Sequence, residues 1–95
     1  MTVFHPGHEE LHGVTVVIEG TSGRTWVGRY HETNPQGVVL RDVASHDPTT
    51  STLTRGSWIE RIRKFGVPVE APRLILPRQE AGPITRLTDW VEYTR

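Results

Sequence analysis

The first half of the chain alternates apolar and polar residues in a pattern that predicts three β-strands. Residues 14–18 alternate with a period of two, which places one row of side chains on a core. Residues 25–31 repeat the alternation, and residues 38–43 are β-branched and apolar enough for a central strand. Turn-forming stretches at 20–23 and 34–37 separate the three runs. We therefore expect an antiparallel meander.

The middle of the chain is predicted to leave the sheet. Residues 45–52 are polar and without periodicity, which indicates a loop. Residues 58–65 place apolar side chains at helical spacing, Ser57 and Glu60 have the spacing of a capping box, and Gly66 would end the helix. A bent strand is the alternative, because the same apolar residues suit a sheet and the helix would be short. The helix is the favoured interpretation.

Two further strands are predicted near the end of the sequence. Residues 74–76 form a short apolar run closed by Pro77, and residues 84–90 form a second run with imperfect alternation. Asp89 and Glu92 would cap a terminal helical turn.

The composition limits the class of protein. A length of 95 residues predicts one domain, and so short a chain buries only about 60–65% of its unfolded surface, so we expect an oligomer or a compact barrel. The 11 basic and 11 acidic residues balance, and the absence of cysteine excludes disulfides, zinc ribbons and thiol catalysis. Because no signal peptide or membrane-spanning run is visible, we expect a cytoplasmic protein without a membrane partner.

The strand pattern resembles the Sm-like (LSm) family. Residues 14–43 resemble its first motif, with Gly23 at the turn and Gly28 at a mid-strand position where a missing side chain lets a short sheet bend sharply. Residues 74–87 resemble its second motif, which is a strand, a tight turn and the final strand.

This resemblance implies a mainly β fold: a small, five-stranded, strongly bent, antiparallel SH3-like (Sm-like) barrel. The whole of 1–95 would be one Sm-like domain, with a short N-terminal helix at 6–12. An insertion at about 44–72 would form an extended loop or short helix before the fourth strand. The family also forms rings in which the fourth strand of one subunit pairs with the fifth strand of the next. The implied partner is therefore a second copy of this chain in a homo-oligomer.

The family's base-binding pattern is incomplete in this sequence. Asn34 stands where the family usually has Asp, and Gly37 or Val38 stands where it has the Asn that frames a stacked base. Of the family's Arg-Gly pair only Arg78 is kept, which is a planar cation able to stack on a base or pair with phosphate.

A basic strip with aromatic neighbours lies in the second half of the chain. The strip consists of Arg55, Arg61, Arg63 and Lys64, interleaved with Trp58 and Phe65, which is a composition typical of nucleic-acid-binding surfaces. The alternative is the solvated basic face of an amphipathic element. The candidate residues for single-stranded RNA are Tyr30, His31, Asn34 and Arg78 for bases, and Arg61, Arg63 and Lys64 for phosphates.

Residues 8–12 spell a literal H-E-x-x-H motif. On a helix, His8 and His12 would lie one turn apart and could hold zinc. Gly13 and a strand follow at once, which leaves little helix to bury a metal, so we expect surface polar residues and no cofactor. Because no P-loop, dinucleotide fingerprint or nucleophile elbow is present, we also expect that the protein is not an enzyme.

Two hypotheses about function remain open on the sequence. One is a ring-forming Sm-like protein that binds RNA through its loops and the basic strip. The other is an oligomeric structural or protein-interaction module with the same barrel and no nucleic-acid binding.

Overall fold

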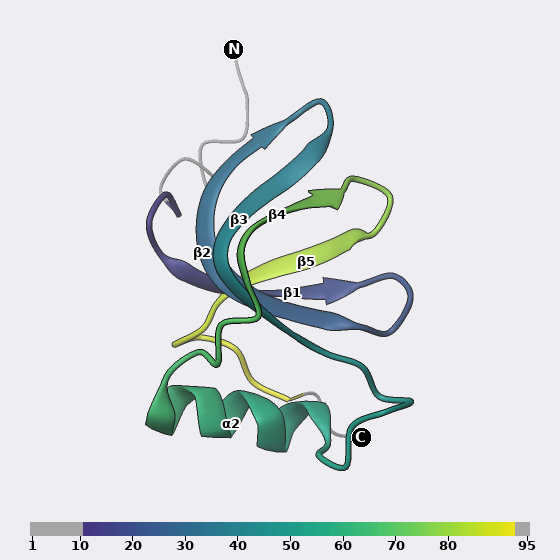
Figure 1. Cartoon of the computed structure of the whole chain (residues 1–95), viewed down its shortest axis with the longest axis vertical. Coiled ribbons are helices and arrows are strands. Elements are labelled where there is room, and N and C mark those ends of the chain that lie inside the picture. Colours follow the sequence, from purple (N-terminus) through teal and green to yellow (C-terminus); the bar gives the residue numbers. More distant parts are fainter. Residues whose placement is uncertain (1–10, 93–95) are drawn as a thin grey trace.

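A computed structural model describes residues 11–92 and shows five antiparallel strands and one helix (Figure 1). In chain order the elements are β1 (Thr15–Gly20), β2 (Thr25–Asn34), β3 (Gly37–His46), α2 (Arg55–Phe65), β4 (Ala71–Pro77) and β5 (Ala81–Arg86). The strands form one sheet in the order β4-β3-β2-β1-β5, so the predicted mainly β, five-stranded antiparallel fold is confirmed. Because β4 and β5 are not paired with each other, the sheet is not closed and has two edges.

The paired strands β2 and β3 bend strongly along their length (Figure 1). The register between these strands shifts after Val27, and Asp42 takes a positive φ of 53° at the same place. A Cβ atom on Gly28 would lie 3.0 Å from the carbonyl oxygen of Arg41, which is closer than side chains normally approach a backbone oxygen. The missing side chain at Gly28 therefore permits the close strand contact on which the bend depends.

Each face of the sheet contributes to its own hydrophobic core. The concave face carries the larger core, whose buried members are Leu11, Val16, Ile18, Trp26, Tyr30, Val38, Leu40, Val43 and Leu76. On the opposite face α2 packs across the strands (Figure 1), and this second core consists of Val17, Val27, Ala44, Trp58, Ile59, Ile62 and Trp90. Strand alternation explains the division, because neighbouring residues of one strand point to opposite faces.

Residues 55–65 form the predicted helix and not the alternative bent strand. The cap differs from the prediction, since the helix begins one turn earlier and the Oγ1 of Thr54 accepts the N–H of Ser57 at 3.1 Å. The Ser57 and Glu60 pair therefore lies inside the helix. Gly66 ends the helix, as predicted, with a φ of 93° that favours glycine.

Two boundaries differ from those expected. β3 continues to His46, so the loop predicted at 45–52 begins two residues later. The Nε2 of His46 lies 2.8 Å from the carbonyl oxygen of Leu53 at the other end of this loop. The run predicted as a strand at 84–90 leaves the sheet after Arg86, because the N–H groups of Asp89 and Trp90 bond to the carbonyl of Arg86 and turn the chain toward α2. Most of the helix expected at 6–12 lies outside the described residues.

Candidate interaction surfaces

Two of the turns in which RNA-binding residues were predicted lie at the same end of the sheet. Asn34 lies in the β2–β3 turn and is paired in register with Gly37. Gly37 is in turn paired with Pro77, the residue before Arg78 in the β4–β5 turn. Arg78 is exposed. The fold thus places Asn34 and Arg78 at the same end of the sheet, two strand positions apart, although they are far apart in the sequence.

The remaining groups at this end are already engaged within the fold. Tyr30 is only 3% exposed and its hydroxyl lies 2.5 Å from the Oγ1 of Thr33, so its ring belongs to the larger core. The Oδ1 of Asn34 accepts the backbone N–H groups of Gln36 and Gly37 and so stabilises the turn. His31 is half-buried.

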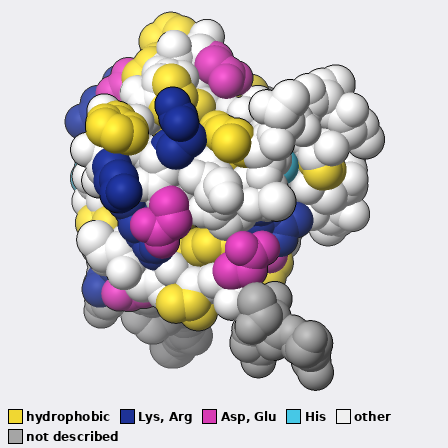
Figure 2. All heavy atoms as spheres, turned by 90° about the horizontal axis from the view of Figure 1, so that it is seen from below, with side chains coloured by type: hydrophobic (Ala, Val, Ile, Leu, Met, Phe, Trp, Pro, Cys, Tyr) yellow, Lys and Arg dark blue, Asp and Glu magenta, His cyan; other side chains and the backbone are white. Residues whose placement is uncertain are grey.

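The predicted basic strip on α2 is divided by the packing of the helix. Arg61 and Lys64 are exposed, and the Arg61 guanidinium lies 6.0 Å from the centre of the Phe65 ring. Arg63 points instead to the segment after β5, where it donates to the carbonyl of Leu87. Figure 2 shows basic, acidic and apolar side chains mixed on the face that includes α2, with no continuous basic surface.

Of the two histidines considered as candidate metal ligands, His8 and His12, only His12 lies in the described part of the chain. His12 lies with its Nδ1 2.7 Å from the carbonyl oxygen of His31, and the two imidazole rings are 5.2 Å apart. Between residues 11 and 92, no group of three or more His, Cys, Asp and Glu side chains could hold a metal ion. His8 lies outside the described residues.

The two edge strands are marked by proline. Pro72 and Pro77 lie in β4 and Pro83 lies in β5, whereas β1, β2 and β3 contain none. Proline cannot donate to a β-ladder and is therefore tolerated mainly in edge strands. Proline has no backbone N–H group to offer to a further strand. The uninterrupted stretches without proline are Arg73–Leu76 in β4 and Ile84–Arg86 in β5.

Apolar side chains accompany the β4 edge. Leu74 and Ile75 are half-buried and lie on opposite faces of the strand. A groove of about 340 Å³ runs beside them, with Trp26 and Leu76 among the residues that line it. An added strand would therefore gain both backbone hydrogen bonds and apolar contact at this edge.

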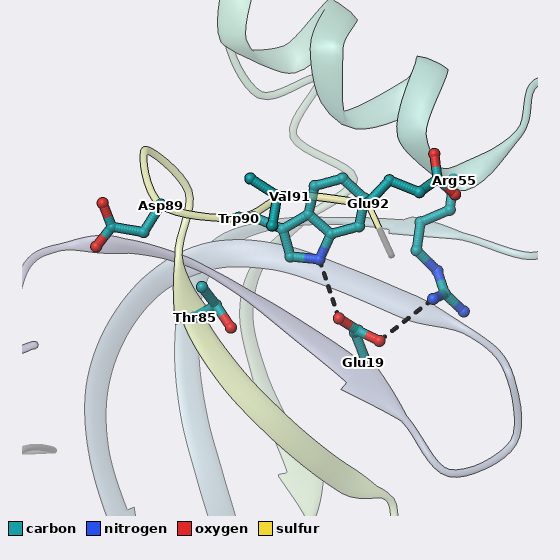
Figure 3. A pocket seen from close by; sticks show the side chains of 7 residues that line it. All are labelled: Glu19, Arg55, Thr85, Asp89, Trp90, Val91 and Glu92. Carbon is teal, nitrogen blue, oxygen red and sulfur yellow. Dashed lines mark hydrogen bonds and ion pairs between the residues drawn. The ribbon is translucent and has the colours of Figure 1, made fainter. Parts of the chain in front are cut away.

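A second hollow, of about 300 Å³, lies where β1, α2 and the segment after β5 meet (Figure 3). Here the Glu19 carboxylate joins two side chains: Oε2 accepts the indole N–H of Trp90 at 3.0 Å, and Oε1 accepts Arg55 at 3.2 Å. The hydrogen bonds connect the first strand, the start of the helix and the segment that follows the last strand. Both oxygens of Glu19 have a partner, whereas the Nε of Arg55 is buried without a hydrogen-bond partner among the described residues. Because the contacts of Glu19 connect three separate parts of the chain, we interpret this hollow as a structural junction.

Sequence reasoning did not find this junction, whereas the family resemblance did imply that the fourth and fifth strands lie at the edges of the sheet. Glu19 and Arg55 are 36 residues apart and carry no local signal of pairing. The edges did carry a signal, namely the confinement of strand prolines to β4 and β5.

Comparison with known proteins identifies the fold alone. The sequence matches no protein-family model and no curated protein. The structure is similar to a chain in the "Crystal structure of the NatC complex bound to CoA", with a TM-score of 0.52, 16% sequence identity, and coverage of 90% of this chain and 87% of that chain. The likeness thus extends over nearly the whole of both chains. No helix within residues 11–92 combines the length and the apolar character needed to cross a membrane.

Proposed function

We propose that the protein is an Sm-like assembly module that associates with copies of itself by strand pairing. In this proposal the β4 edge of one copy pairs with the β5 edge of the next and continues the sheet from molecule to molecule. Such a head-to-tail contact makes a ring if the rotation between copies closes.

The observation that carries the proposal is the pair of open edges on one curved sheet. Strand pairing needs an unpaired backbone and a side-chain surface that gains by being covered. The Arg73–Leu76 stretch offers both, because Leu74 and Ile75 remain half-buried beside the groove. Ile84 in β5 is likewise half-buried.

Two further features support an Sm-like module. The glycine at position 28, which sits at the bend, and the short turn between β4 and β5 are the two features of the family's motifs that support the resemblance. The similar chain belongs to a multi-component assembly, the NatC complex, which favours an interaction role over an isolated one.

The test is the mass of the protein in solution. We expect light scattering after size exclusion to give a multiple of the 10.8 kDa chain mass. Ile75→Lys should shift the protein toward the monomer, because lysine on an edge strand opposes pairing. Gln79→Lys introduces the same charge in the exposed β4–β5 turn and serves as the matched control. A wild-type protein that stays monomeric at all concentrations would contradict the proposal.

RNA binding is the second candidate, and the position of the Asn34 and Arg78 turns at the same end of the sheet favours it. A ring would carry one Asn34 and Arg78 pair in each subunit, and several weak contacts made at once would raise the affinity for a single RNA strand. Fluorescence anisotropy with a labelled single-stranded RNA should then show weaker binding for Arg78→Ala and little change for Arg86→Ala, an exposed arginine at the far end of β5. Equal effects of the two substitutions would argue against this candidate.

Three expectations from the sequence stay predictions. They are the absence of enzymatic activity, the absence of a cofactor and a cytoplasmic location.

A further inference from the structure

Three arginines lie directly opposite one another on neighbouring strands. Arg29 of β2 is the register partner of Arg41 of β3, and Arg41 is the register partner of Arg73 of β4. Partners in adjacent strands point to the same face, and all three residues are exposed. We call these three residues the arginine row. It runs across the strands on the face that also carries α2, and includes none of the residues predicted to bind RNA.

The row has too few counter-charges of its own. Arg29 forms an ion pair of 2.5 Å with Asp42, whose positive φ of 53° lies in the β3 distortion. Arg41 and Arg73 have no ion pair or side-chain hydrogen bond with any residue in 11–92. Like charges directly opposite one another destabilise a sheet. An anionic partner would remove this repulsion.

The spacing of the row fits one kind of partner better than others. Side chains directly opposite on adjacent strands have Cβ atoms about 4.5–5.5 Å apart. Acidic residues at i, i+3 or i+4 on an α-helix have Cβ atoms about 5–6 Å apart, which is nearly the same repeat. Alternate residues of an extended peptide are about 6.6–6.8 Å apart and lose register over three positions.

The surroundings of the row favour a protein over a nucleic acid. Ile75 and Val39 form the next pair on the same face. Val39 is fully buried, so the half-buried Ile75 supplies the apolar surface beside Arg73. Single-stranded nucleic acids are usually held by exposed aromatic rings as well as cations. Within the described chain, tryptophan and Tyr30 side chains are buried, and the exposed Phe65 belongs to α2.

We propose that the arginine row is a docking site for the acidic face of an α-helix from another protein. The helix lies across β2, β3 and β4, and Asp or Glu residues spaced by three or four positions form bidentate pairs with the guanidinium groups. Two carboxylates pair with Arg41 and Arg73, and a third competes with Asp42 for Arg29. The site does not depend on pairing at the sheet edges, because the row lies on the face of the sheet.

The experiment measures peptide binding by fluorescence anisotropy at low salt. The probe is a labelled helical peptide with Glu at i, i+4 and i+7, and the control peptide has the same composition with its Glu residues at i, i+5 and i+10, so that no two of them are neighbours on one helix face. We expect the first peptide to bind at least about tenfold more tightly, because only it matches the row along its whole length. Equal binding of the two peptides would overturn the proposal.

Substitutions in the protein test the residues separately. Arg41→Glu should weaken binding by about tenfold or more, whereas Arg61→Glu, the same charge change on the exposed face of α2, should leave it unchanged. Asp42→Asn should strengthen binding by about threefold, since Asn tolerates the positive φ and removes the competing carboxylate. Equal losses for Arg41→Glu and Arg61→Glu would mean non-specific attraction and would overturn the site.

Two more measurements test the kind of partner and the folding of the variants. A 12-nucleotide single-stranded RNA that binds more tightly than the helical peptide, and loses affinity in Arg41→Glu, would overturn the choice of a protein partner. Circular dichroism establishes that each variant is folded. Arg41→Gln should unfold at a temperature equal to or above that of the wild type at low salt, because it relieves repulsion.

Discussion

The guanidinium group of Arg63 in α2 donates two hydrogen bonds to the main-chain carbonyl of Leu87, from Nε at 3.1 Å and from Nη2 at 2.8 Å. Nη2 also donates to the carbonyl of Trp90, and Nη1 donates to Glu60 at 2.7 Å. One arginine thus attaches the segment after β5 to the helix. A residue that looks like part of a basic surface in the sequence is a structural tie in the fold.

Arg63→Met should lower the free energy of unfolding by about 2 kcal/mol, because hydrogen bonds from a charged, largely covered donor are lost while the apolar stem is kept. Urea denaturation followed by tryptophan fluorescence measures the change. The matched control is Lys64→Met on the exposed side of the same helix, for which we expect less than about 0.5 kcal/mol. Equal losses in the two variants would contradict the structural role of Arg63.

Trp90→Ala should destabilise the fold by about 3–5 kcal/mol, since Trp90 is 5% exposed and fills the second core between sheet and helix. Trp90→Phe offers a milder test for the case in which the alanine variant is too unstable to purify, because it keeps most of the apolar ring volume and loses the bond to Glu19 with the rest of the indole. Val91→Ala is the control, as Val91 is 74% exposed. Chemical denaturation should rank wild type and Val91→Ala together, then Trp90→Phe, then Trp90→Ala.

Gly37→Ala should be among the most damaging single changes in the sheet. A Cβ atom at this position would overlap the carbonyl oxygen of Leu76 on β4, and the backbone has a φ of 150°. We expect a loss of more than about 2 kcal/mol, because β4 would have to move away from β3. Gly66→Ala, where φ is 93° but no atom lies within 4 Å, should cost about 1 kcal/mol from backbone strain alone. Thermal unfolding of both variants compares crowding with strain.

The Asp47 carboxylate should titrate at a lower pH than an ordinary aspartate. The hydroxyl and the backbone N–H of Thr49 both donate to its Oδ1, at 2.7 Å and 2.9 Å, and lower its pKa from the usual 3.8. Since the folded pKa is the lower one, the contribution to stability is present above the unfolded pKa and is lost as the pH falls through the folded pKa. Carboxyl chemical shifts measured by NMR give the midpoint. Thr49→Val should raise the midpoint, and an unchanged midpoint would show that the hydroxyl has no effect.

The strands could be predicted because their signal is local. The alternation at 14–18 and 25–31 divides the side chains between two faces, and the structure uses both, with Trp26 in the larger core and Val27 in the second. The helix was also predictable from its apolar spacing. Its cap at Thr54 was missed because Ser57 offered an equally plausible local pattern.

The interaction surfaces were harder to predict because they depend on register. Arg29, Arg41 and Arg73 look like isolated charges until strand pairing aligns them. The division of the basic strip likewise depends on Arg63 meeting Leu87, which is 24 residues away. The spacing of charges within one element says nothing about contacts that only the packing of distant elements creates.

The hydrogen bond between Glu19 and Trp90 spans 71 residues, and β1 pairs with β5 as well as β2. During synthesis, the first strand therefore leaves the ribosome long before β5 and Trp90 exist. The β1–β3 meander can form early, but its second apolar face stays uncovered until both α2 and Trp90 have emerged. Completion of the fold waits for the emergence of Trp90, and until then the growing chain is most exposed to aggregation and most in need of a chaperone.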